Sequence, residues 1–321
     1  MPVPPRLVDF LRATYGVLSS RPARVVFLVL VLVIATRAIV VEWPHIKDAL
    51  ADLDPLAVLG ALLALLAGMM AALAAWRTLM AGLGSPLPWQ VAGKVLFVGQ
   101  LGKYLPGSIW PMVAQMELGR DYGVPRRRSA TVFVLLTALN LASALGTACL
   151  VLPFADGVDS RLAWLALLTP VFWSAFHPRV LNPLVDLMLK ITRGEPLERP
   201  ITLATSATAL VALLVQWIFF GVHILVLGVD LGAPAPASDL AAGAIGGFAV
   251  AWALGPLLVI APAGLGVREV TLVAVLAPPL TGPAALVVAI VSRLLMTVTD
   301  LLLALVFYVL GRVSARRTSV T

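Results

Sequence analysis

The stretch "VGQLGKYLPGSIWPMVAQMELGRDYGVPRRR", residues 98–128, interrupts a chain that is otherwise rich in leucine, valine and alanine. Its glycines and prolines break helical backbone, because proline lacks an N–H group and glycine adopts conformations that other residues avoid. Its centre carries Lys103, and it ends in three consecutive arginines. Polar, broken backbone of this kind needs a structural reason in so apolar a chain.

The composition places this chain in a lipid bilayer. Of its 321 residues, 60% are hydrophobic and 12% are charged, whereas soluble domains carry about 25% charged residues. The apolar runs at 25–36, 55–76 and 286–310 reach or approach the roughly 20 residues of a membrane-spanning helix, once flanking residues are counted. We predict an all-α polytopic protein with about six full spans, forming a single membrane domain over residues 1–321.

The distribution of charge predicts the orientation. Arginines and lysines precede the first apolar run, follow the second, and recur at 126–128, within 177–200 and at the carboxyl terminus, whereas turns such as 154–159 are acidic. Because basic segments stay in the cytoplasm, we predict a cell-membrane protein with both termini inside. Segments 1–24 and 312–321 are then cytoplasmic. This topology accounts for the net charge of +7, so no nucleic-acid partner is expected.

Residues 177–200 combine basic side chains with apolar residues at helical spacing. Such a segment is typical of an amphipathic helix that lies on a membrane surface. We therefore expect it on the cytoplasmic side, in contact with anionic headgroups.

The number of membrane crossings between two cytoplasmic segments must be even, and this determines the path of the broken stretch. If Arg77 and residues 126–128 both lie inside, residues 91–118 must enter the membrane and return to the same face as a re-entrant hairpin. Irregular backbone at membrane depth is tolerated only where it is buried in protein or lines a watery cavity, so the tip should face a cavity. The hinge residues expected at this tip are Gly102, Pro106 and Gly107.

A second broken motif, "IAPAGLGVREV" at 260–270, interrupts the apolar region 240–280. Parity requires this region to begin and end outside, either as a second re-entrant hairpin or as two shorter spans. As a hairpin, it would let two tips enter from opposite faces and meet near the midplane, in a possible inverted repeat. Paired broken helices of this kind mark substrate sites in transporters. Its hinge residues are Pro262, Gly264 and Gly266.

Charged side chains within these motifs are the candidate site. Intramembrane charge is costly unless it is paired or hydrated, and Lys103 and Arg268 each lie in a broken motif. Together they suit a lipid phosphate, which a guanidinium binds with two parallel hydrogen bonds. In the alternative, Arg268 pairs with Glu269 or Glu117 and only stabilises the fold.

Two further charges, Arg293 and Asp300, lie seven residues apart on one face of the last helix, too far apart to pair directly. Each therefore needs a partner on another element, and Asp300 could answer Arg268 or Lys103. Tyr104 and Trp110 flank the first tip, either as interfacial anchors or along a headgroup path. The predicted substrate-binding residues are Lys103, Tyr104, Trp110, Arg268, Glu269 and Arg293.

Both motifs, "GKYLPGSIWPMVAQMELGRDYGVPRRRSA" and "PAGLGVREVTLVAVL", resemble the signature regions of the lysylphosphatidylglycerol synthase transmembrane-region family, whose members are also described as flippase-like. The resemblance implies a domain that occurs alone or attached to a soluble lipid aminoacyltransferase and moves a modified or glycan-linked lipid between leaflets. One departure is that many relatives carry a glutamate in the helix after the basic loop, where this chain offers Thr137 and Asn140. The resemblance supports Gly102, Lys103, Tyr104, Pro106, Gly107, Trp110 and Arg120, and Pro262, Gly264, Gly266, Arg268 and Glu269.

Three classes of function follow. Translocation of an anionic, phosphate-bearing or glycan-linked lipid is favoured by the two motifs. An intramembrane enzyme is not expected, since the sequence has no HExxH, GxSxG or metal-ligand pattern, and no cofactor or nucleotide-binding loop is indicated. The alternative is a non-catalytic partner or scaffold of a lipid-modifying enzyme or glycosyltransferase, which would need no such chemistry.

Overall fold

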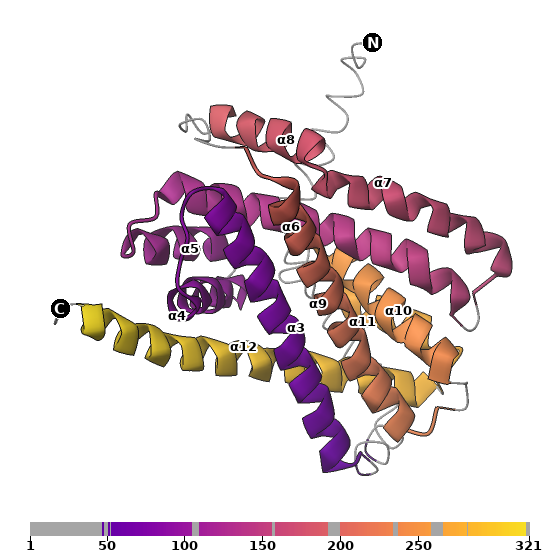
Figure 1. Cartoon of the computed structure of the whole chain (residues 1–321). Helices are drawn as coiled ribbons and strands as arrows, with labels where there is room; N and C mark the ends of the chain where they lie inside the picture. The colour runs from indigo at the N-terminus through magenta and orange to yellow at the C-terminus, as the bar shows by residue number, and fades with distance from the viewer. Residues whose placement is uncertain are drawn as a thin grey trace, which may run out of the picture.

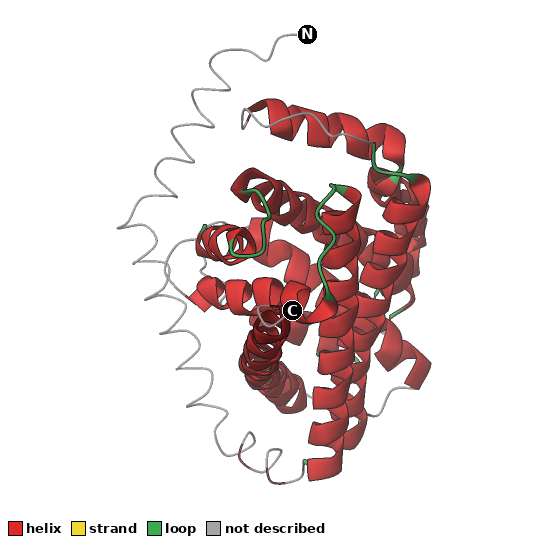
Figure 2. Ribbon diagram, turned by 60° about the vertical axis from the view of Figure 1, so that its left-hand side comes forward, coloured by secondary structure: helices red, strands yellow, loops and turns green. Residues whose placement is uncertain are grey.

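The computed structural model describes Lys47, Ala51 and residues 53–104, 109–155, 158–191, 200–233, 237–257, 266–280 and 282–318. All secondary structure in these ranges is helical, which confirms the all-α prediction (Figure 2). Several predictions fall outside the described residues, namely the first span at 25–36, the whole of segment 1–24, and the hinges Pro106, Gly107, Pro262 and Gly264.

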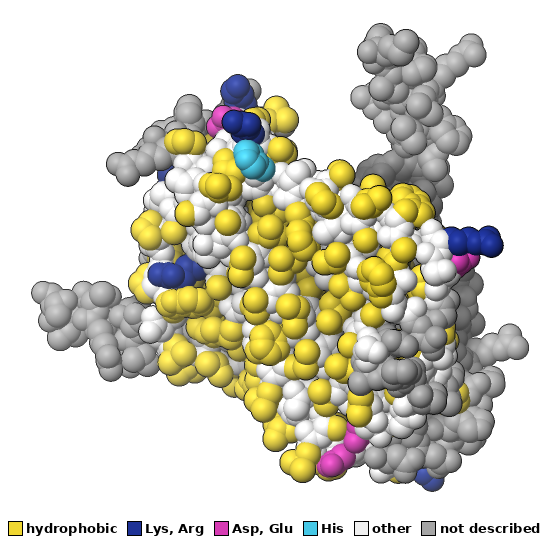
Figure 3. Space-filling view, turned by 45° about the vertical axis from the view of Figure 1, so that its right-hand side comes forward, with side chains coloured by type: hydrophobic (Ala, Val, Ile, Leu, Met, Phe, Trp, Pro, Cys, Tyr) yellow, Lys and Arg dark blue, Asp and Glu magenta, His cyan; other side chains and the backbone are white. Residues whose placement is uncertain are grey.

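Within the described ranges, four helices are long and apolar enough to cross a membrane. They are α3 (Pro55–Gly82), α6 (Arg126–Val151, continued by the 3-10 turn η3, Leu152–Phe154), α9 (Leu203–Asp230) and α12 (Gly282–Thr318). Their starts follow from sequence: the Asp54 carboxylate accepts from the Leu56 N–H, and the Thr202 hydroxyl accepts from the Thr205 N–H, as N-caps do. The broad hydrophobic face of the molecule has charged side chains only at its margins (Figure 3).

Residues 160–176 form a rod of three short helices that runs back along α6 (Figure 1). It consists of η4 (Ser160–Leu168), α7 (Thr169–Trp173) and η5 (Ser174–Phe176). The Thr169 hydroxyl donates to the Gly146 carbonyl at 3.1 Å, and Trp173 fills the space beside that glycine. The contact holds the rod against α6.

Helices α3 and α9 form a close antiparallel pair (Figure 1). A Cβ atom at Gly68 would lie 2.7 Å from the Phe220 ring, so glycine is what allows this approach. At one end of the pair, the Asp54 N–H donates to the Asp230 carboxylate at 2.9 Å. We call this the Asp54 end of the bundle, and the opposite end, where α3 finishes, the Ser85 end.

The described part of the amphipathic segment forms α8 (Pro178–Ile191), and one side of its apolar face packs against the bundle. Leu181 and Val185 are fully buried in the bundle, and the Asn182 amide is hydrogen-bonded to both backbone groups of Ile201. The bundle core therefore covers part of the apolar stripe, whereas Val180 and Leu187 are exposed, so contact of this helix with a membrane surface stays a prediction.

The first broken motif is a hairpin whose two ends meet at the Ser85 end. Arg128 Nη1 donates to the Gly84 carbonyl at 2.9 Å and to the Ser85 hydroxyl at 2.7 Å. The outgoing arm consists of α4 (Trp89–Gly93), the π-helix η1 (Lys94–Val98) and the 3-10 helix η2 (Leu101–Tyr104), and α5 (Trp110–Arg120) returns. At the tip, a Cβ atom on Gly102 would lie 2.7 Å from the Pro111 nitrogen, so this hinge must be glycine.

The second broken motif starts and finishes at the Asp54 end. Leu240 in α10 (Ala237–Leu257) and Leu280, after α11 (Val267–Leu276), both contact the position of Gly228 near the end of α9. The ten-residue α11 is only about 15 Å long, half the hydrocarbon thickness. Both broken motifs therefore return to the end of the bundle at which they start, and these are opposite ends; we call the two motifs the first and the second hairpin.

This arrangement predicts which exposed positions share a membrane face. In a Cys149→Ala background, Gln90→Cys and Asp121→Cys both lie on exposed surface at the base of the first hairpin. We expect both to be shielded from an impermeant thiol reagent added outside intact cells, whereas the exposed Ser160→Cys should react. Labelling of Gln90→Cys and Asp121→Cys on opposite faces would contradict the hairpin.

A charge cluster at the middle of α12

The central part of α12 presents polar residues on one face. Arg293, Met296 and Asp300 follow at intervals of three and four residues, which places them in one stripe. Asp300 comes 18 residues after Gly282 in a helix of 37 residues, near its middle. A carboxylate at this depth requires cations from neighbouring elements.

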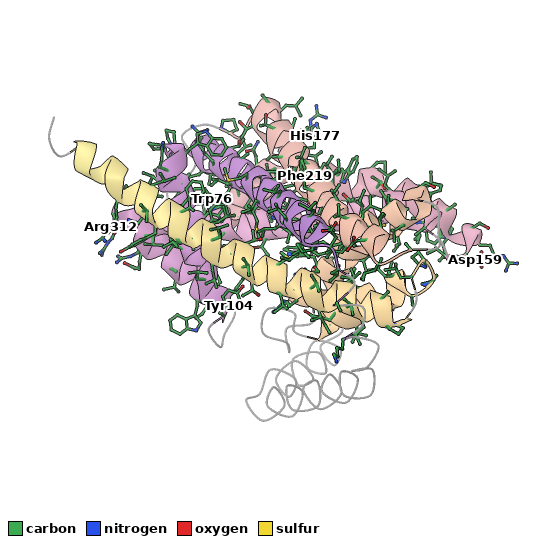
Figure 4. All side chains as sticks on the ribbon, turned by 90° about the horizontal axis from the view of Figure 1, so that it is seen from below. Trp76, Tyr104, Asp159, His177, Phe219 and Arg312 are labelled. Atoms are coloured by element: carbon green, nitrogen blue, oxygen red, sulfur yellow. The ribbon has the colours of Figure 1, made fainter. Side chains whose placement is uncertain are left out.

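The first hairpin supplies a cation and a hydroxyl to Asp300. Lys103 Nζ lies 2.6 Å from Asp300 Oδ2, and the Tyr104 hydroxyl donates to the same oxygen at 2.7 Å. Figure 4 shows Tyr104 beside α12. The Asp300 side chain is 6% exposed and that of Lys103 is 29% exposed, so the acceptor is buried while its donors reach the surface.

The second hairpin supplies the partner of Arg293. Gly266 precedes α11 with φ of +82°, a left-handed conformation that favours glycine. Its N–H donates to Glu269 Oε2 at 2.8 Å, so Glu269 caps its own helix, while Glu269 Oε1 lies 3.6 Å from Arg293 Nη1. Glu269 is therefore occupied by Arg293 rather than by its neighbour in sequence.

Arg268 is the exceptional member of the site. It is 8% exposed, its guanidinium carbon lies 4.4 Å from the centre of the Phe248 ring, and its Nη2 lies 2.7 Å from the Met296 sulfur. Among the described residues, no carboxylate forms an ion pair with it. A thioether is a weak acceptor, so this buried cation is only partly compensated.

These five ionic residues form what we call the α12 charge cluster, made of Lys103, Arg268, Glu269, Arg293 and Asp300. Three cations face two carboxylates, which leaves a formal charge of +1 (3 − 2). The described parts of both hairpins contact α12 here, through Lys103 and Tyr104 on one side and Glu269 on the other, and the amino-terminal end of α11 adds partial positive charge. The arrangement can bind an anion that brings one negative charge.

The other predicted site residues are distributed around this cluster. Trp110 opens α5 with its backbone against Gly102, and its side chain is 42% exposed. Glu117, considered as a partner for Arg268, instead pairs with Arg126 at 2.7 Å on the surface, with Arg120 3.8 Å away. Glu117 and Arg120 thus belong to the base of the first hairpin rather than to the cluster.

Asp300, Met296 and Phe248 complete the site beyond the predicted set. The spacing of Asp300 from Arg293 marks it in the sequence, but only as a possible ion-pair partner of a cation on another element. Met296 shares that stripe, whereas Phe248 lies in an apolar run without any local signal.

Asn140 accepts a hydrogen bond from the buried Gln216 amide at 3.0 Å. It is one of the two polar residues found where the family resemblance implies a glutamate. Thr137 donates to its own helix through the Phe133 carbonyl. The Asn140 contact joins α6 to α9, so this position serves packing here.

Comparison with known proteins gives one family. The profile of the family described as "Lysylphosphatidylglycerol synthase TM region" matches residues 23–304, which include both hairpins and all five residues of the charge cluster. A search of curated proteins found no match to the chain.

The two roles of Glu269 can be separated by substitution. Glu269→Gln removes the ion pair with Arg293 but keeps an oxygen for the Gly266 N–H, whereas Glu269→Ala removes both. We expect Glu269→Ala to lower the free energy of unfolding by about 0.5–2 kcal/mol more than Glu269→Gln, the usual worth of a cap. Thermal unfolding of the purified variants in detergent measures this, and equal losses would show that the cap contributes nothing.

Proposed function

Because the chain belongs to the lysylphosphatidylglycerol synthase transmembrane-region family, we propose that this integral membrane protein moves an anionic, phosphate-bearing lipid between leaflets, with its headgroup at the α12 charge cluster. The proposal assigns no covalent step to the chain. Membership in the family supports membrane lipids as partners. Translocation of the lipid is our addition.

The observation that carries the proposal is the incompletely compensated charge of Arg268. A buried guanidinium that rests on an aromatic ring and a thioether keeps hydrogen-bonding capacity for an oxyanion. Lys103 belongs to the first hairpin but reaches the same stripe of α12 through its ion pair with Asp300, and its side chain is partly exposed. A lipid phosphate that reached Lys103 would therefore meet a second cation one or two helical turns further along.

Opposed hairpins also support movement across the membrane. One tip approaches α12 from the Ser85 end and the other from the Asp54 end, so each could open toward a different leaflet while the cluster stays in place. Broken helices that meet near the midplane are the usual setting of transporter sites. In this proposal the Ser85 end faces the cytoplasm, as the basic residues 126–128 indicate.

Substitution of the two central cations tests the binding site. Each of Lys103→Ala and Arg268→Ala should weaken binding of phosphatidylglycerol about tenfold or more, because each removes a charge-assisted hydrogen bond worth roughly 1.5–3 kcal/mol. Arg268→Lys should also bind weakly, since it keeps the charge but loses the planar fork. Microscale thermophoresis with labelled phosphatidylglycerol and purified protein in nanodiscs measures the affinities.

The matched control is Arg161→Ala, which removes an exposed arginine on η4 and should leave binding unchanged. Wild-type affinity in correctly folded Lys103→Ala and Arg268→Ala proteins would remove the anion site from consideration.

Translocation requires its own measurement. In proteoliposomes with fluorescent phosphatidylglycerol in both leaflets, the wild-type protein should raise the fraction bleached by external dithionite well above the outer-leaflet share. Lys103→Ala should abolish the rise. Lipid binding without any such rise would instead favour a scaffold that presents lipid to a lipid-modifying enzyme or glycosyltransferase.

A further inference from the structure

Asp300 is the one acidic residue of the cluster that occupies the donors a lipid phosphate would need. Its Oδ2 atom alone accepts from both the Lys103 ammonium at 2.6 Å and the Tyr104 hydroxyl at 2.7 Å. An incoming phosphate oxygen has the same requirement for donors as this carboxylate oxygen. The two anions therefore compete for one position.

Exposure decides from which side such competition occurs. The Lys103 side chain is 29% exposed and Tyr104 is 44% exposed, whereas the Asp300 side chain is 6% exposed. Lysine carries three donors, so a phosphate can make its first contact with Lys103 from the open side before the carboxylate leaves. The donors are thus reachable while their present acceptor stays behind them.

We propose that Asp300 is the resident counter-anion of the site, which holds Lys103 and Tyr104 in the absence of lipid and is displaced from them by a lipid phosphate. The inference rests on the proposed function, since it assumes that Lys103 binds the lipid. It adds that Asp300 lowers the affinity for lipid.

The released carboxylate has a second cation within reach. Arg268 donates to Met296, and Met296 lies four residues before Asp300, so the two side chains are neighbours on one face of α12. Exchange of a thioether for a carboxylate gives Arg268 a much stronger acceptor. A guanidinium has five N–H donors, so Arg268 can hold this carboxylate and still contact the lipid phosphate. Lipid binding therefore moves Asp300 from the first hairpin to the second without leaving any buried charge unpaired.

Asp300→Asn tests the exchange through the sign of its effect. The amide keeps the shape of the side chain but no longer competes as an anion, so phosphatidylglycerol in nanodiscs should bind about tenfold more tightly than to wild type. Diacylglycerol, which has no phosphate, should bind equally to both proteins. Unchanged or weaker phosphatidylglycerol binding by folded Asp300→Asn would overturn the proposal.

Glu269→Gln is the matched control, because it removes the same charge from the same cluster but its carboxylate faces Arg293 rather than Lys103. We expect a clearly smaller gain in affinity than for Asp300→Asn. Equal gains would show that only net charge matters, and would also overturn the exchange.

The double variant Lys103→Ala/Asp300→Asn keeps the test decisive if Asp300→Asn fails to fold, because it removes both partners of the pair. It should bind as weakly as Lys103→Ala, since no lysine remains to be released. A return to wild-type affinity would overturn the exchange. Wild-type binding by Lys103→Ala itself would instead refute the lipid site, so the two failures are distinct.

Discussion

The ion pair between Lys103 and Asp300 fixes the geometry of the rest of the structure. A carboxylate near the middle of a long apolar helix needs a cation at the same depth, and one route for it is a chain that turns back inside the bundle. The first hairpin provides that route: its tip is closed by Gly102 against Pro111, and its base is tied by Arg128 to Gly84 and Ser85. The site and the fold thus share one requirement.

The second hairpin meets the same helix by a different device. Its short helix α11 starts at a left-handed glycine, and Glu269 both caps that start and faces Arg293. Arg268, the preceding residue, contacts the Phe248 ring and the Met296 sulfur. Because two hairpins from opposite ends converge on one stripe, a movement of either tip changes the partners available to α12. This is the physical basis of our proposal that the cluster takes part in lipid movement rather than in a static structural role.

Sequence alone predicted much of this arrangement, for identifiable reasons. The positions of the arginines required the first broken motif to return to its starting face, and left the second open between a hairpin and two shorter spans. The seven-residue spacing of Arg293 and Asp300 required each to find a partner elsewhere. It could not predict which partner, because pairing depends on how deeply each hairpin enters. Nor could it find Phe248, whose contact with Arg268 leaves no local pattern. The periodicity of α8 showed an apolar face but not whether lipid or, as observed for Leu181 and Val185, protein covers it.

The hydrogen bond between Tyr104 and Asp300 also joins residues that are 196 positions apart in the chain. A ribosome adds about 5–20 residues per second, so the first hairpin is made on the order of 10–40 s before the helix that neutralises it. During that interval Lys103 has no Asp300 to pair with, and the tip must rely on water or headgroups. The last long helix therefore completes the molecule electrostatically as well as mechanically, and a chain released before α12 would keep an uncompensated cation in its membrane domain.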